Sequence, residues 1–149
     1  MPDLNDVAQL AATNRHLAIV ATMRDDGTIQ SSLVNAGVSA HPVTGRQVLS
    51  FVAIGGGAKL AHLRRRPAVT TTFQSGWEWI TVEGTAELAG PDDPELGLDS
   101  EQLRILLRTI FTDAGGTHDD WPTYDATMAR ERRAAVLITP TRIYSNPAR

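Results

Sequence analysis

Turn signals divide this chain into short β-rich segments, and that division limits what the chain can fold into. Residue pairs that favour tight turns recur between apolar runs: Asp26-Gly27, His41-Pro42, Thr44-Gly45 and Ser75-Gly76. The remaining runs predict six strands, at 16–23, 29–38, 47–54, 68–74, 77–88 and 134–144, the last bent at Pro140. Six short antiparallel strands with few helices indicate a mainly β, α+β fold, namely a small barrel decorated by peripheral helices.

Four segments have the periodicity or the boundary residues of helices. The first is short, with Leu4, Val7, Leu10 and Ala11 at helical spacing, and the second spans 58–66 and is closed by Pro67. The third follows an Asp99/Gln102 capping box and stops before Gly115-Gly116. The fourth spans 121–133, with Pro122 in its first turn. The third carries a single apolar stripe, formed by Leu103, Leu106, Leu107, Ile110 and Phe111. That stripe predicts packing of this helix against the sheet.

Length and composition exclude several classes of protein. A chain of 149 residues with 42% hydrophobic content fits one domain, 1–149, with a normal core. A net charge of −3 argues against general nucleic-acid binding. The absence of cysteine excludes disulfides and thiolate chemistry and fits a reducing, cytoplasmic location. The first residues are acidic and contain no long apolar run, so neither a signal peptide nor a membrane segment is expected.

One lysine stands out among the basic residues. Lys59 is the only lysine, and it follows Gly55, Gly56, Gly57 and Ala58 between a predicted strand and a predicted helix. Glycines allow backbone N–H groups to approach an anion, a helix N-terminus favours negative charge, and lysine adds a cation. The segment therefore predicts a phosphate-binding site. The alternative is an ordinary glycine turn with a solvated lysine. Neither the Walker nor the dinucleotide-binding glycine pattern is present.

Polar and aromatic residues on nearby predicted strands are candidates for further contacts with a ligand. Gln30, Ser32 and Asn35 on the second strand could bind a ring or a polyol chain, or could face water. Trp77 and Trp79 are two residues apart, so they are expected on one strand face, where they could pack in the core or line a flat ligand. The sequence does not decide between these alternatives.

The helix after Lys59 carries further titratable residues. His62 lies three residues on, on the same helix face, and could reach the phosphate or be solvated. Arg64, Arg65 and Arg66 suit a solvated helix end, or could meet an acidic ligand tail. No spacing of His, Asp or Glu predicts a metal site, and no arrangement of residues identifies a catalytic acid, base or nucleophile.

Four pieces of the sequence, in this order, resemble the pyridoxamine-5′-phosphate-oxidase-like split-barrel superfamily. They are the hairpin at 16–30, the helix Lys59-Leu-Ala-His-Leu-Arg-Arg-Arg-Pro67, the strand Trp79-Ile-Thr-Val-Glu-Gly-Thr-Ala86, and a tail with His118–Tyr124, Arg130–Arg133 and Ile143-Tyr144. The tail is similar to the actinobacterial branch that uses the deazaflavin coenzyme F420. Some relatives have arginine where this chain has Gly57. The resemblance implies a six-stranded, FMN-binding-like split barrel.

The resemblance also implies a function and a partner. It implies a homodimer that holds F420, or alternatively FMN, between subunits, with Lys59 at the cofactor phosphate. Trp77, Trp79, Trp121 and Tyr124 offer aromatic surface for such an interface, although Trp121 and Tyr124 could instead pack between helices. The expected activity is hydride transfer from the reduced cofactor to a small conjugated substrate, with neither nucleic acid nor membrane as a partner. The alternatives are an FMN-dependent enzyme of the oxidase type and a non-catalytic module that binds a cofactor or a tetrapyrrole.

Overall fold

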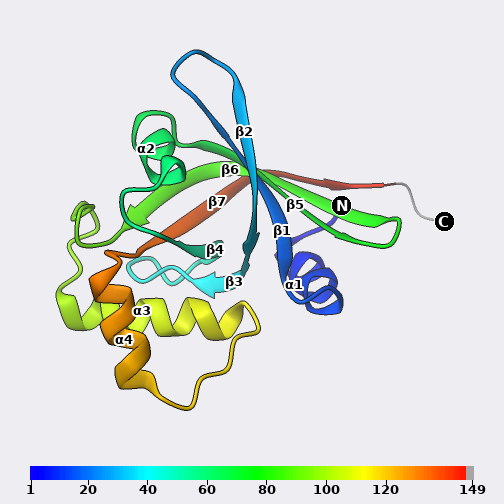
Figure 1. Cartoon of the computed structure of the whole chain (residues 1–149). Helices are drawn as coiled ribbons and strands as arrows, with labels where there is room; N and C mark the ends of the chain where they lie inside the picture. Colours follow the sequence, from blue (N-terminus) through cyan, green and yellow to red (C-terminus); the bar gives the residue numbers. More distant parts are fainter. Residues whose placement is uncertain (147–149) are drawn as a thin grey trace.

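An antiparallel sheet forms the centre of the protein, and the chain order of its strands differs from their order in space (Figure 1). The computed structural model describes residues 1–146. The strands are β1 (Leu17–Met23), β2 (Ile29–Asn35), β3 (Gly37–Ala40), β4 (Gln47–Ala53), β5 (Ala68–Ser75), β6 (Glu78–Ala89) and β7 (Ala134–Ser145). They are arranged as β2-β1-β5-β6-β7-β4-β3. The mainly β fold with peripheral helices is confirmed, with seven strands in place of six in the described part of the chain.

The additional strand arises because the predicted strand at 29–38 changes partner at Ala36. β2 pairs with β1, whereas β3 pairs with β4 at the other end of the sheet. Between them the Ala36 N–H donates to the His16 carbonyl over 2.9 Å. Since β2 and β3 are the two edges of the sheet, the single residue between them brings these edges together. The sheet is therefore curved into a split barrel.

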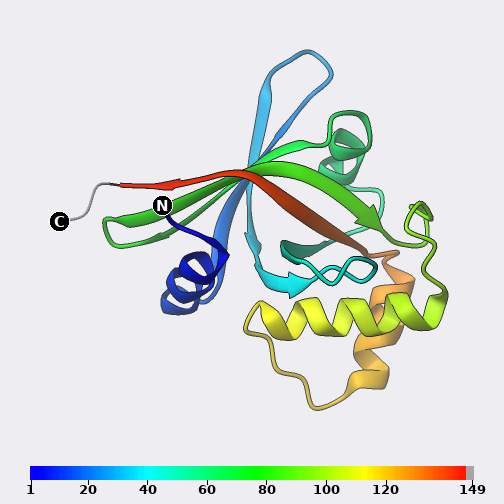
Figure 2. The same cartoon turned by 180° about the vertical axis from the view of Figure 1, so that it is seen from behind.

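Within residues 1–146, four helices lie around the sheet. They are α1 (Leu4–Thr13), α2 (Ala58–Arg65), α3 (Ser100–Asp113) and α4 (Trp121–Arg130). The Asp99/Gln102 capping box is confirmed at the start of α3. α4 ends at Arg130, earlier than expected, because Arg132 has a left-handed backbone conformation with φ of 49°. α3 and α4 lie together on one side of the molecule, away from the β1–β2 hairpin (Figures 1 and 2).

The core has two parts, one inside the barrel and one beneath α3. Alternating residues of β1, including Ala18 and Val20, point into the barrel and pack in the first cluster with Phe51 and Phe73. The second cluster joins the predicted apolar stripe of α3 to the outer side of the sheet; its buried members are Val48, Ala89, Leu106, Leu107, Ile110, Ala135 and Leu137. Consecutive residues of β4 and β7 are buried because one face is covered by α3 and the other lines the barrel interior.

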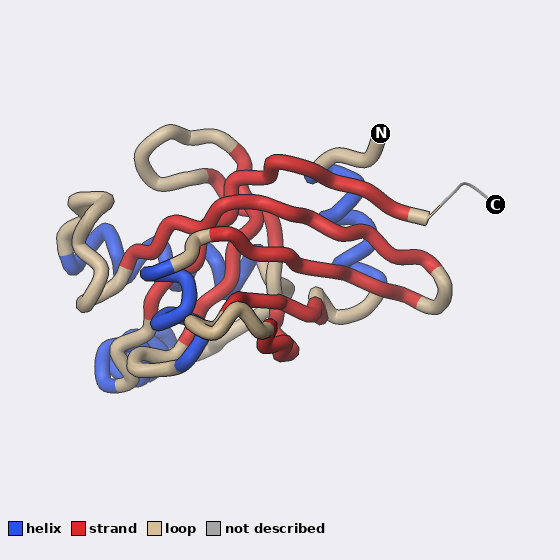
Figure 3. Tube along the Cα trace, turned by 90° about the horizontal axis from the view of Figure 1, so that it is seen from above, coloured by secondary structure: helices blue, strands red, loops and turns tan. Residues whose placement is uncertain are grey.

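Two predictions about β6 and β7 need correction or refinement. Trp77 lies in the turn before β6, where Gly76 adopts φ of 60°, so Trp77 and Trp79 do not share a strand face. β7 continues through Pro140 as one strand, with a register shift at its pairing with Glu83 and Gly84. Figure 3 shows these long strands side by side from above, with helices at the periphery.

Candidate functional site

The three glycines before Lys59 form the turn that leads from β4 into α2. Gly56 has φ of 77°, and the Gly57 N–H donates to the Ile54 carbonyl over 3.3 Å. A Cβ on Gly55 would lie 2.4 Å from the Arg132 carbonyl oxygen. The turn and this close backbone approach therefore account for Gly55 and Gly56 without a ligand. The N–H groups of the first turn of α2 have no side-chain cap, so they remain available to an anion.

Lys59 lies half-buried on α2 and reaches across to β2. Its Nζ donates a hydrogen bond to Ser32 Oγ over 2.8 Å. Among residues 1–146, no carboxylate oxygen lies within 4.0 Å of this ammonium group. A partly buried cation whose side-chain partner is a neutral hydroxyl is poorly compensated, which favours an anionic ligand at this position.

Gln30 and His62 belong to the same polar cluster as Lys59 and Ser32. His62 Nδ1 lies 3.0 Å from Oγ1 of Thr22, which is buried on β1. Thr22 is paired across the sheet with Gln30, whose Oε1 is buried and has no hydrogen-bond partner. Gln30 and Ser32 are two residues apart on β2 and share a face. The structure thus brings four predicted site residues together beside the first turn of α2.

Asn35, Trp77 and Trp79 lie outside this polar cluster, although Asn35 lines the cavity that contains Lys59. The Asn35 side chain donates to the Arg15 carbonyl over 2.9 Å, and strand alternation puts it on the opposite face of β2 from Ser32. Trp77 is 81% exposed in the β5–β6 turn. The Trp79 ring packs edge-on against Tyr144, with 6.1 Å between ring centroids. Within one chain, neither tryptophan lines the cavity that contains Lys59.

This cavity, which we call the Lys59 pocket, has a volume of about 400 Å³. Its walls come from β2, the end of β4, and both α3 and α4; they include Leu33, Ile54, Phe111, Tyr124 and Met128. The α3 and α4 residues were not identified as site residues from the sequence. The apolar stripe of α3 was the available signal, but a stripe does not reveal which cavity it borders.

Tyr124 is held in the wall of the Lys59 pocket as a neutral phenol. Its hydroxyl donates to the Leu107 carbonyl over 3.0 Å, and burial raises its pKa to about 12. The ring also contacts Phe111, Trp121 and His118. Tyr124 is therefore buried and Trp121 is packed in an intrachain aromatic cluster, so of the two alternatives for these residues, helix packing is confirmed, and they do not offer spare aromatic surface for an interface.

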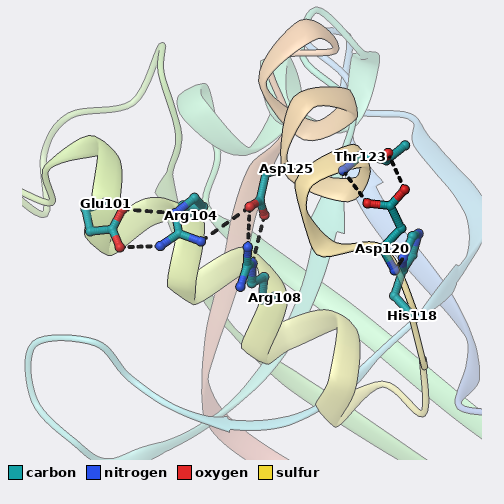
Figure 4. Close-up of polar contacts among 7 residues, drawn as sticks. All are labelled: Glu101, Arg104, Arg108, His118, Asp120, Thr123 and Asp125. Carbon is teal, nitrogen blue, oxygen red and sulfur yellow. Dashed lines mark hydrogen bonds and ion pairs between the residues drawn. The ribbon is translucent and has the colours of Figure 1, made fainter.

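Ion pairs between α3 and α4 fix the position of this wall (Figure 4). Arg108 Nε donates to Asp125 Oδ1 over 2.9 Å, and Arg104 binds the same carboxylate while also binding Glu101. The hydrogen bond from Arg108 lowers the pKa of Asp125. The Arg108 guanidinium also lies 5.1 Å from the centroid of the Trp121 ring. These contacts orient Tyr124 and Met128 toward the pocket.

The three arginines at the end of α2 are already paired with carboxylates. Arg64 forms two hydrogen bonds with Asp93, of 2.7 and 2.8 Å, and Asp93 is 4% exposed. Arg65 and Arg66 both bind Asp25 in the β1–β2 turn, over 2.7 and 2.8 Å. These residues are therefore less available to an acidic ligand than the sequence alone indicated.

Two general features bear on the class of site. No group of three His, Cys, Asp or Glu residues within 1–146 has the arrangement needed to hold a metal ion. No helix in that range is both long and apolar enough to cross a membrane. What the cluster at Lys59 can do chemically is bind an anion at a helix start, next to a mainly apolar pocket and a buried acceptor.

No model of a known protein family matches the sequence. Solved structures do match the fold. A conserved hypothetical protein from Mycobacterium tuberculosis superposes with a TM-score of 0.69 at 18% identity, covering 97% of this chain and 84% of the other. A pyridoxamine 5′-phosphate oxidase-related, FMN-binding protein from Nostoc punctiforme gives 0.66 at 14% identity, covering 97% and 83%. A protein described as an F420 reductase gives 0.58 at 20% identity, covering 87% and 90%.

Proposed function

We propose that this chain, which has the pyridoxamine-5′-phosphate-oxidase-like split-barrel fold, is an F420-dependent oxidoreductase. The observation that carries the proposal is the half-buried ammonium of Lys59, which donates to the neutral Ser32 hydroxyl at an uncapped helix start. A phosphate would provide the negative charge that this ammonium lacks. F420 and FMN each present a phosphate, and a protein described as an F420 reductase is among the neighbours in fold.

The residues present fit such a cofactor. Lys59 and the first N–H groups of α2 would hold the phosphate. The unpartnered Gln30 Oε1 is an acceptor that needs a donor, and a cofactor hydroxyl or ring N–H is one. Ser32 and His62 flank this acceptor from β2 and α2. The apolar walls of the Lys59 pocket would exclude water from a flat ring.

The reduced deazaflavin, when bound, supplies the hydride, and the protein supplies binding, orientation and exclusion of water. Phe111 and Met128 give the pocket an apolar surface suited to a small conjugated substrate. Tyr124 does not act as the proton donor, since its hydroxyl is bound to the Leu107 carbonyl and its pKa is raised to about 12. We assign proton delivery to solvent and name no catalytic acid or base.

A homodimer is part of this proposal. Ile19 and Leu33 are opposite each other on β1 and β2, as are Met23 and Ile29, and all four side chains are exposed on one face. Such an apolar face is typical of a surface that another molecule covers. Leu33 also lines the Lys59 pocket, so a second copy on this face would also close the pocket. The cofactor would then lie between subunits.

Light scattering tests the dimer. We expect twice the mass of a 16.1 kDa chain at micromolar concentration. Ile19→Asp places a charge on the apolar face and should produce monomers, because an unpaired charge at an interface costs several kcal/mol, on the order of 3. Ile105→Asp is the matched control, since Ile105 is similarly exposed but lies on α3. Dissociation by both variants, or by neither, would contradict the assigned face.

Mixing two variants tests whether the partner subunit completes the site. Trp77 is exposed and does not line the Lys59 pocket within one chain, so we assign its cofactor contact to the second copy. Dimers of Lys59→Ala and dimers of Trp77→Ala should each bind cofactor weakly. Mixed dimers should regain one intact site, with Lys59 from one chain and Trp77 from the other. No regained binding, with mixed dimers verified by mass, would contradict a shared site.

Titration of the purified protein with F420 and with FMN tests the cofactor. We expect tighter binding of F420, followed by oxidation of reduced F420 in the presence of a conjugated carbonyl or imine acceptor. FMN binding alone would favour the second candidate, an FMN-dependent enzyme, for which the FMN-binding neighbour from Nostoc punctiforme is the supporting observation. Binding without turnover of any acceptor would favour the non-catalytic module.

A further inference from the structure

A second and larger cavity lies where α3 and α4 meet the connector at 90–98, and we call it the connector groove. Its volume is about 690 Å³, within the range of roughly 300–1,000 Å³ that is typical of small-molecule sites. Leu98, Leu103 and Met128 line it, and these side chains are only partly buried at the edge of the second core cluster. The groove therefore presents apolar surface that the chain itself does not cover.

Ion pairs fix the walls of the connector groove. In the connector, Asp92 is bound by Arg132 and Asp93 is bound by Arg64, so this segment is held at two consecutive residues. On the other side, the contacts of two α3 arginines with Asp125 hold α4 against α3 (Figure 4). A cavity with walls fixed in this way is preformed, as ligand pockets usually are.

The same ion pairs leave no free charge in the groove that would select an ion. The guanidinium groups that line it are each paired with a carboxylate: Arg104 with Glu101 and Asp125, Arg132 with Asp92, and Arg133 with Glu131. The start of α3 is capped by Asp99, which accepts the Gln102 N–H over 2.8 Å. An ion would lose hydration there without gaining an unpaired partner, whereas an apolar molecule gains by leaving water.

We propose that the connector groove binds a neutral, apolar small molecule. The molecule packs on Leu98, Leu103 and Met128, and the charges at the rim stay paired with one another. This site goes beyond the proposed redox function, because only Met128 and Arg133 also border the Lys59 pocket.

The test uses N-phenyl-1-naphthylamine, which is uncharged and whose fluorescence rises in apolar surroundings. We expect saturable binding of one molecule per chain. The affinity should not fall as the salt concentration is raised, because no charged contact is present to be screened.

A charged analogue tests the selectivity for a neutral molecule. 8-Anilinonaphthalene-1-sulfonate has the same ring system with a sulfonate added. Both probes are compared in Lys59→Ala, so that the Lys59 ammonium does not attract the sulfonate. The sulfonate should bind no more tightly than the neutral probe, since it finds no unpaired cation in the groove. Tighter binding of the sulfonate in this variant would contradict the proposal.

Substitutions on α4 locate the neutral probe. Ala129 is exposed and lines the groove. Ala129→Trp places an indole ring on the apolar surface and should weaken binding at least about tenfold, because a filled space accepts further atoms only with strain. Ala126→Trp, at a second exposed position of the lining, should act in the same way. Ala12→Trp, the same change at an exposed position of α1, should have no effect. Circular dichroism checks that each variant remains folded.

Four further results would overturn the proposal. The first is the absence of saturable binding. The second is equal binding by the Ala129→Trp and Ala12→Trp variants, which would place the probe elsewhere on the surface. The third is a loss in Ile54→Trp as large as in Ala129→Trp, which would place the probe in the Lys59 pocket that Ile54 lines. The fourth is a probe affinity that falls as the protein concentration rises, which would assign the groove to a second copy of the chain. Failure of F420 and FMN to bind would leave this site unaffected, so the two proposals can fail separately.

Discussion

The two ends of α2 differ in how their cations are paired. At the first turn, Lys59 donates to the neutral hydroxyl of Ser32. At the last turn, Arg64 is bound to the buried carboxylate of Asp93, and Arg65 and Arg66 both bind Asp25. Both ends of this eight-residue helix carry positive charge; the sequence predicted phosphate binding at Lys59 and left the three arginines either solvated or facing an acidic ligand tail. The contacts distinguish the two ends. A cation that is already compensated holds the fold together, and a cation without a carboxylate partner can bind a ligand.

The largest expected effect is on stability, at the arginine end. Arg64→Ala would leave the carboxylate of Asp93, which is 4% exposed, without its cation. We expect a loss of about 2–3 kcal/mol in the free energy of unfolding, below the range for a fully buried pair because Arg64 is partly exposed. Urea denaturation measures it. Cofactor affinity of the folded variant should be unchanged.

A paired substitution is the control for this prediction. Arg64→Met combined with Asp93→Asn removes both charges, so no unpaired charge remains buried, and the loss should be smaller than for Arg64→Ala alone. A double variant that is as unstable as the sum of the two single variants would show that the pair itself contributes little and that the lost packing dominates.

A smaller effect is expected at the lysine end when the hydroxyl partner is removed. Ser32→Ala removes the β2 hydroxyl that accepts the hydrogen bond from the Lys59 ammonium on α2 and orients it. Loss of one such hydrogen bond should lower cofactor affinity by about 2- to 10-fold. Ser145→Ala is the matched control, because Ser145 is an exposed serine at the end of β7, away from the Lys59 pocket and from the proposed dimer face. Equal cofactor affinities of the two variants would show that the Ser32 hydroxyl does not contribute to the ligand site.

The smallest effect is expected from the two outer arginines. Arg65→Gln combined with Arg66→Gln breaks pairs with Asp25 that are largely exposed. Exposed pairs typically contribute up to about 1 kcal/mol each, so both stability and F420 affinity should change little. Binding curves at low and high salt check this. A strong loss of F420 affinity that disappears at high salt would show that these arginines attract the acidic tail despite their pairing.

Local signals in the sequence predicted much of the fold. The Asp99/Gln102 capping box and the start of α2 after the glycines are confirmed, because each depends on residues within a few positions. The break at Ala36 was not predicted, since it depends on which strand each half of the segment pairs with. Pairing between distant strands leaves no mark in the local sequence pattern of 29–38.

The candidate site also has a part that adjacent residues predict and a part that depends on tertiary contacts. The position of Lys59 at a helix start follows from adjacent residues and was predicted. The pairing of Arg64 with Asp93, 29 residues away, and of Arg66 with Asp25, 41 residues away, depends on tertiary contacts that sequence spacing does not reveal. The contribution of Phe111 and Tyr124 to the Lys59 pocket was missed for the same reason.

The most direct test of the central claim compares substitutions at the two ends of α2 in one binding assay. Affinities for F420 and FMN are measured for the unchanged chain, Lys59→Ala, Lys59→Arg and Arg65→Ala. We predict that Lys59→Ala lowers affinity by about 10- to 100-fold, as expected for loss of a charged hydrogen bond to phosphate, and that Lys59→Arg loses less. Arg65→Ala, on the same helix, should have little effect. Equal affinities for Lys59→Ala and the unchanged chain would contradict the account.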